Sequence, residues 1–184
     1  MNPHVCCFTN LIGLGAAPTI AVLSQDSVYV GANLRTPEQP FYPWRTTGVT
    51  EQTAVIDLLA ATPVSFVAII RANYTTAFIQ ANPTDSWGSP AINVALNPAR
   101  NPLHSRYCAA AVLGNVNYRY LRLRIPAQTP VPESGQSTID YFITGGLVVG
   151  VAVELPLHFE RVQYRRVQPR KFLKPDHEGW EQAW

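Results

Sequence analysis

The sequence predicts an all-β protein, and three observations support this fold class. Several apolar runs alternate with polar residues at a period of two, as in strands that bury one face. Turn clusters separate these runs, and the chain contains 16 prolines and 11 glycines. No window combines a sustained helical period with a cap at both ends. Short strands separated by such turns indicate a β-sandwich or a barrel.

The strand signal is clearest over residues 119–125, where Leu and Ile occupy one face and Tyr and Arg the other. A second segment alternates in the same way, and a third is a β-branched and aromatic run. Two glycine-separated segments near the end of the domain complete the set. We therefore expect strands at residues 54–59, 64–70, 119–125, 139–143 and 147–155.

Single residues between these runs have predicted structural roles. Trp44 follows two prolines and is suited to close one end of the sandwich with its ring. Arg45 is expected to pair with Asp57 or to cap exposed carbonyl groups, because its planar guanidinium offers several donors. Gly145 and Gly146 between the last two runs permit a bulge or a close strand approach.

The apolar content and the charge pattern divide the chain into two parts. With 47% hydrophobic residues, the chain can bury a core without disulfides or a metal. The net charge is +2, but residues 161–174 contain six basic residues and no acid, whereas residues 175–184 contain three acids. We expect a β-sandwich domain over residues 1–156, with residues 1–30 as its lead-in, and an extended C-terminal arm over residues 157–184.

The arm is expected to dock on a neighbouring protein. Exposed tryptophans are unfavourable unless something covers them, and two lie in its last five residues. Nucleic-acid binding by the basic segment is a weaker interpretation, because the acidic end would repel the same polyanion. The expected assembly contacts are the basic and aromatic side chains of the arm: Arg161, Arg165, Arg166, Arg170, Lys171, Lys174, Trp180 and Trp184.

Cysteine usage and hydropathy suggest a reducing compartment and no membrane span. Cys6 and Cys7 are adjacent, which is unfavourable for an ordinary disulfide, and Cys108 stands alone. The apolar run over residues 11–23 lacks a basic segment before it, so we expect no signal peptide. The longest uncharged stretch, between Asp140 and Glu154, is too short to span a bilayer.

No residue pattern predicts catalysis, a metal or a cofactor. The four histidines lack ligand spacing, no serine lies in a nucleophile motif, and no base or oxyanion donor is indicated. Asp57 and Asp140 lie on predicted strands and are interpreted as structural carboxylates with partners rather than catalytic ones. We therefore expect a protein that is not an enzyme and binds no cofactor.

Several landmarks follow one another between residues 30 and 155. They are Asn33-Leu34, Trp44-Arg45-Thr46-Thr47, and the segments 54–58, 66–77, 119–125 and 142–150. Their order resembles a group of bacteriophage minor tail and baseplate proteins that are built on a galactose-binding-like, discoidin-type jelly roll. The chain departs from that group at Leu59, where glycine is common, and at Leu121, where an aromatic residue is common.

The resemblance implies a structural component of a phage tail, at the tail tip or baseplate. Such a protein would assemble in the host cytoplasm, become part of the virion tail, and contact the tail tube, hub and tape-measure proteins. A homo-oligomeric ring is the expected state.

The alternative is a carbohydrate-binding module that recognises host surface glycans, since jelly rolls of this type often bind sugars through loops. Residues 73–106 are rich in loops and offer aromatic and hydrogen-bonding groups. The candidate glycan contacts are Tyr74, Asp85, Trp87 and Arg100. Trp87 has a second interpretation, in which it only packs a long loop.

Overall fold

The structure is a computed structural model that describes residues 4–6, 9–13, 18–37, 41–101, 106–132 and 138–155. Residues Val5–Glu154 form one compact unit. Most of the other unit, which includes the predicted arm, lies outside the described residues, so the arm and its eight expected contacts stay predictions. The described part has one short 3-10 helix, η1 (Gly31–Arg35), and strands β1 (His4–Cys6), β2 (Thr19–Val22), β3 (Trp44–Arg45), β4 (Gln52–Ala72), β5 (Ala77–Asn82), β6 (Ile92–Leu96), β7 (Ala99–Asn101), β8 (Arg106–Ile125), β9 (Ile143–Gly150) and β10 (Val153–Leu155).

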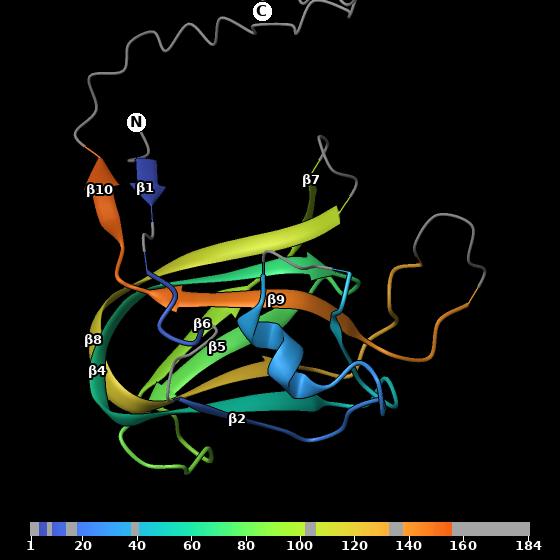
Figure 1. Ribbon diagram of the computed structural model, residues 1–184, viewed down its shortest axis with the longest axis horizontal. Coiled ribbons are helices and arrows are strands. Elements are labelled where there is room, and N and C mark those ends of the chain that lie inside the picture. The colour runs from blue at the N-terminus through green and yellow to red at the C-terminus, as the bar shows by residue number, and fades with distance from the viewer. Residues whose placement is uncertain are drawn as a thin grey trace, which may run out of the picture. The chain divides into compact units, whose positions relative to one another are not determined.

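Two long strands, β4 and β8, connect the two layers of the sandwich. The first part of β4 pairs with β2 and with the end of β8, which continues the layer to β5 and β6. The second part of β4 pairs with β9 and with the start of β8, and β3 and β7 complete that layer. Figure 1 shows both strands curving from one layer into the other. All of these pairings are antiparallel, and β1 and β10 form a separate two-stranded sheet.

The core lies between the layers because each strand buries alternate residues. Ala54 and Ile56 of β4 and Leu121, Leu123 and Ile125 of β8 are 0% exposed, as the alternation predicts. Trp44 is also fully buried, and its indole Nε1 donates a hydrogen bond to the Ser24 carbonyl oxygen at 2.9 Å. The predicted closing role of Trp44 therefore agrees with its position in the core.

The strand boundaries differ from the predicted ones in five places. Residues 54–59 and 64–70 belong to one continuous strand, and residues 119–125 are only the last part of β8. The stretch 73–106, expected to be mostly loop, contains β5, β6 and β7. Of the predicted strand 139–143, only Ile143 is in a strand, and the predicted strand 147–155 is divided between β9 and β10.

Two positions in the strands have backbone environments that favour glycine. Gly146 lies inside β9 rather than between two strands, and a Cβ there would lie 2.7 Å from the Cβ of Pro37. The expected close approach at this glycine is therefore present. Leu59, at the bend of β4, has a φ of 67°, a conformation that favours glycine.

Candidate functional site

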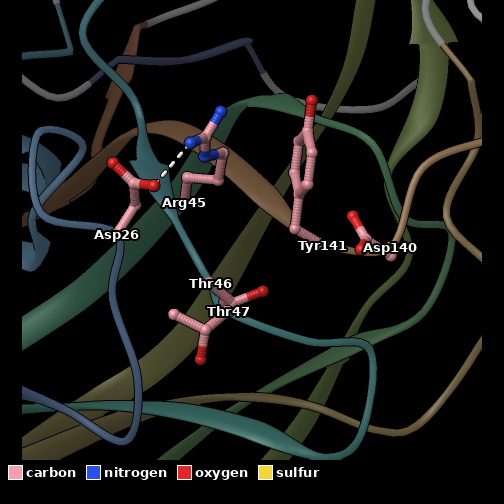
Figure 2. Close-up of a pocket in the computed structure, with 6 residues that line it drawn as sticks. All are labelled: Asp26, Arg45, Thr46, Thr47, Asp140 and Tyr141. Carbon is pink, nitrogen blue, oxygen red and sulfur yellow. Dashed lines mark hydrogen bonds and ion pairs between the residues drawn. The ribbon is translucent and has the colours of Figure 1, made fainter.

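A polar pocket of about 240 Å³ opens where β3 ends and β9 begins. Figure 2 shows the six residues that line it, and they come from three separate segments of the chain. The segment after β2 supplies one of them, the end of β3 and the loop after it supply three, and the segment before β9 supplies two. The lining residues are Asp26, Arg45, Thr46, Thr47, Asp140 and Tyr141.

An ion pair between Asp26 and Arg45 forms one wall of the pocket. Arg45 Nη2 lies 2.5 Å from Asp26 Oδ2, and the dashed line in Figure 2 marks this contact. Asp26 Oδ1 also accepts hydrogen bonds from the backbone N–H groups of Val28 and Tyr29. These contacts, with the Arg45 hydrogen bond as the largest, hold the pKa of Asp26 below its ordinary value. The pair therefore stays charged at neutral pH.

Backbone hydrogen bonds fix this wall to the sheet. The Asp26 N–H donates to the Arg45 carbonyl oxygen, and the Arg45 N–H donates to the Tyr29 carbonyl oxygen, both at 2.9 Å. The Arg45 guanidinium carbon also lies 4.8 Å from the ring centroids of both Tyr29 and Tyr141, within the range of a cation–π contact. Arg45 is thus held from several sides in a single orientation, which is the preorganisation that a binding site needs.

The floor of the pocket is fixed by side chains that replace a strand ladder. Thr46 Oγ1 accepts a hydrogen bond from the Phe142 N–H at 2.8 Å. The amide of Asn73 donates to the Tyr141 carbonyl oxygen at 3.0 Å and accepts from the Ile143 N–H at 2.7 Å. Asn73 is only 2% exposed. One backbone contact continues from the pairing of β3 with β9, since the Thr46 N–H donates to the Phe142 carbonyl oxygen at 3.0 Å. The Phe142 N–H and the Tyr141 carbonyl are instead bound by side chains, and this is why the ladder does not extend over residues 139–142.

The remaining lining groups are open to a ligand. Thr47 and Asp140 are exposed, and neither side chain makes a hydrogen bond with another described residue. Together with Arg45 they provide a hydroxyl, a carboxylate and a guanidinium around one cavity, next to the ring of Tyr141. This combination can accept and donate several hydrogen bonds to a small polyhydroxylated molecule, and the ring adds an apolar surface.

Comparisons with known proteins show what the fold is similar to. No family model and no curated protein matches the sequence. Among solved structures, a chitosan-binding module from a Paenibacillus chitosanase/glucanase has a TM-score of 0.53 at 13% identity, over 77% of this chain and 98% of that one. The family 32 carbohydrate-binding module of Clostridium perfringens NanJ, in complex with galactose, has a TM-score of 0.51 at 12% identity, over 72% and 92%. The fold is a galactose-binding-like jelly roll.

A larger enzyme contains a similar jelly roll. The GH29 fucosidase of Ruminococcus gnavus, in complex with fucose, has a TM-score of 0.60 at 12% identity. The alignment covers 80% of this chain but only 28% of the fucosidase. The present chain therefore matches a little over a quarter of that enzyme's length.

The jelly roll buries one of the four predicted glycan contacts. Tyr74 is 0% exposed, its hydroxyl lies 2.8 Å from Thr144 Oγ1, and its ring packs edge-on against Phe142 at 5.8 Å. Burial also raises the pKa of the Tyr74 hydroxyl. Its prediction as a glycan contact is wrong, because the turn after β4 directs the ring into the core.

Two other predicted contacts lie together, away from the pocket. Trp87 Nε1 donates a hydrogen bond to Asp85 Oδ1 at 2.6 Å, and both residues belong to the loop between β5 and β6. The Trp87 ring also packs on the guanidinium of Arg122. The fourth predicted contact, Arg100, lies in β7, and nothing is described of its side chain.

The structure also corrects two predicted carboxylate partners. Arg45 pairs with Asp26, whereas Asp57 pairs with Arg119 through two hydrogen bonds of 2.7 and 2.8 Å. Asp57 is therefore the partnered structural carboxylate that the sequence predicts. Asp140 is not, because it lies before β9 and its exposed carboxylate has no ion pair with another described residue.

The pocket itself could not be identified from the sequence. Asp26 and Tyr141 are far apart in the chain and lie in segments without a recognisable motif. Backbone hydrogen bonds bring Asp26 beside Arg45, and the pairing of β3 with β9 brings Tyr141 to the same place. The one available signal was the Trp-Arg-Thr-Thr segment at residues 44–47, which supplies half of the lining residues.

Two further observations on the described residues concern metal ligation and membrane-spanning helices. No group of three or more His, Cys, Asp or Glu side chains there is arranged to hold a metal ion. Within the same residues, no helix has the length and apolar character needed to cross a membrane.

Proposed function

We propose that this chain is a carbohydrate-binding module that holds one sugar ring of a neutral glycan in the pocket beside β3 and β9. The observation that supports this function best is the pocket lining: an oriented guanidinium, two carboxylates, a free hydroxyl and a tyrosine ring around about 240 Å³. Solved structures with the same fold include modules whose names state that they bind chitosan or that they were obtained with galactose bound.

The charges at the pocket disfavour an acidic sugar. Asp26 and Arg45 neutralise each other, and Asp140 adds one uncompensated negative charge at the rim. A carboxylated or sulfated sugar would be repelled by that charge, whereas the hydroxyl groups of a neutral sugar can donate to it. In this proposal Arg45 donates to ring or glycosidic oxygens, Thr47 and Asp140 bind hydroxyl groups, and Tyr141 packs against the sugar.

A glycan array followed by titration of the best neutral glycan tests the proposal. Thr47→Val and Asp140→Asn remove exposed groups with no described partner, so both variants are expected to fold normally. Each should weaken binding about tenfold, since a hydrogen bond to a charged or well-placed group is worth about 1–2 kcal/mol.

Thr84→Val is the matched control, because Thr84 is exposed on the loop between β5 and β6 and lies outside the pocket. It should leave the affinity unchanged. Equal affinities in all four proteins would place the glycan elsewhere, and an array without any bound glycan would refute the function.

Assembly into a phage tail stays a prediction from the sequence. The arm that would make the contacts lies outside the described residues, and none of the structures named above is a phage protein. Deleting residues 161–184 and measuring incorporation into particles tests it, and undiminished incorporation would contradict it.

A further inference from the structure

Three arginines of β8 lie on the polar face of the layer formed by β2, β4, β8, β5 and β6. Strands β5 and β6 of this layer are labelled in Figure 1. Each guanidinium packs on an aromatic ring. The distances from the guanidinium carbon to the ring centroid are 5.0 Å for Arg119 and Tyr120, 4.6 Å for Arg122 and Trp87, and 5.6 Å for Arg124 and Phe78. We call these three stacked pairs the arginine row.

Two members of the arginine row have a carboxylate partner within the protein. Arg119 binds Asp57 through Nε and Nη2 at 2.7 and 2.8 Å. Arg124 binds Glu51 Oε2 through Nε and Nη2 at 2.8 and 2.6 Å. In both pairs the hydrogen bond to the arginine is the main reason why the pKa of the carboxyl group is below its ordinary value.

Arg122, between them along the row, has no carboxylate hydrogen-bonded to it among the described residues, although the negative charges of Glu51 and Asp85 act on its guanidinium from nearby. Its Nε donates to Gln80 Oε1 at 2.7 Å, and Gln80 in turn donates to Asn93 Oδ1 at 3.1 Å. Neither terminal nitrogen of Arg122 hydrogen-bonds a described residue. Burial lowers the pKa of this guanidinium, since it is partly withdrawn from water without a bound carboxylate.

The ring that stacks on Arg122 is held in place by its own loop. Asn82 donates to the Ser86 carbonyl oxygen at 2.5 Å and accepts from the Ala91 N–H at 3.3 Å, which ties the two ends of the loop together. Trp87 is further fixed by its hydrogen bond to Asp85. Arg122, Trp87 and the exposed Asn93 thus form a preorganised group before any ligand arrives.

We propose that Arg122, Trp87 and Asn93 form a second glycan site on the sheet face, which binds the carboxylate of an acidic sugar such as a uronic acid. The ligand carboxylate forms an ion pair with Arg122, as Asp57 does with Arg119 and Glu51 with Arg124. The Asn93 amide donates to a hydroxyl group of the same sugar, and the Trp87 ring borders it. This inference rests on the proposed function and adds a site with the opposite charge preference.

Titration of the full chain with an oligogalacturonide and with the uncharged galacto-oligosaccharide of equal length tests the second site. Arg122→Gln should weaken galacturonide binding by about 10-fold to 100-fold, as expected for charge-assisted hydrogen bonds. Arg122→Lys, which keeps the charge and removes the planar fork, should also weaken it, and it guards against a folding defect of the first variant. Arg119→Gln is the matched control on the same strand and face, and it should keep full affinity.

The outcomes separate the second site from the pocket. Galacturonide binding that is lost in Arg122→Gln and kept in Asp140→Asn supports the inference. Galacturonide binding that is lost in Asp140→Asn and kept in Arg122→Gln overturns the inference. A wild-type chain that binds only neutral glycans also overturns it, but the proposed function survives that result. An acidic peptide that binds through Arg122 while the galacturonide does not would overturn the sugar as the ligand. A chain that binds no neutral glycan but binds galacturonide through Arg122 would refute the pocket and keep the second site.

Discussion

Asn73 holds the pocket floor, and its replacement by aspartate has a predictable effect on stability. In the wild type the Asn73 amide donates to the Tyr141 carbonyl oxygen at 3.0 Å, and its Oδ1 accepts from the Ile143 N–H at 2.7 Å. Asn73→Asp keeps the second contact but places a carboxylate oxygen against a carbonyl oxygen at a residue that is 2% exposed. We expect a loss of about 3 kcal/mol at neutral pH from the lost bond and the buried charge.

The loss of stability in Asn73→Asp should be larger at neutral pH than at acid pH, whereas most proteins lose stability on acidification. Burial raises the pKa of the introduced carboxyl in the folded state, so the destabilisation is fully present above that pKa and disappears below the pKa of the unfolded chain, about 4. Once protonated, the carboxyl can donate to Tyr141 as the amide does. The difference from the wild type should therefore shrink to about 1 kcal/mol near pH 4.

Urea unfolding of both proteins at pH 7 and near pH 4 measures this difference directly. Asn97→Asp is the matched control, because Asn97 is exposed and its side chain makes no hydrogen bond with a described residue, so its effect should stay within about 0.5 kcal/mol. A difference between Asn73→Asp and the wild type that is absent, or that stays constant between the two pH values, would refute this account of the pocket floor.

Three further predictions concern the fold. Tyr74→Phe leaves the buried Thr144 hydroxyl without its partner and should cost about 1 kcal/mol, measured as a fall in Tm of about 2–4 °C; an unchanged Tm would contradict the buried hydrogen bond. Gly146→Ala should lower the free energy of unfolding in urea by about 1–3 kcal/mol, because the new Cβ meets Pro37. Gly114→Ala, with open space around it, should change stability by less than about 0.5 kcal/mol. Equal effects of the two substitutions would contradict the close approach. The wild type should lose stability in thermal melts as the pH falls below about 4, because carboxylates with a lowered folded-state pKa stabilise the protein only while ionised. The groups concerned are the arginine-paired Asp26, Glu51 and Asp57. A flat stability profile from pH 7 to 3 would contradict this prediction.

Strands with one wet face could be predicted from the sequence, and others could not. The alternation of residues 119–125 is visible because Tyr and Arg face solvent while Leu and Ile face the core. The first part of β8 is rich in alanine and valine and has no such contrast. In β5, Gln80 is 4% exposed although it lies on the polar face, where its side chain hydrogen-bonds those of Arg122 and Asn93.

The false strand at residues 139–143 has a specific physical cause. Its apolar composition is typical of a strand, but the side chains of Asn73 and Thr46 bind several of its backbone groups, and only the contact between the Thr46 N–H and the Phe142 carbonyl continues the pairing with β3. The same side-chain contacts form the pocket floor. The pocket could not be predicted for a related reason: the contacts that form it join segments far apart in the chain and depend on the pairing of β3 with β9.

Amide chemical-shift mapping of the full chain with a saturating neutral glycan is the most direct test of the central claim, that the pocket beside β3 and β9 binds a sugar. The account predicts the largest shift changes at residues 26–29, 45–47 and 140–141, with none of comparable size in the loop between β5 and β6. Shift changes confined to other parts of the chain, or none with any glycan retained on the array, would contradict it.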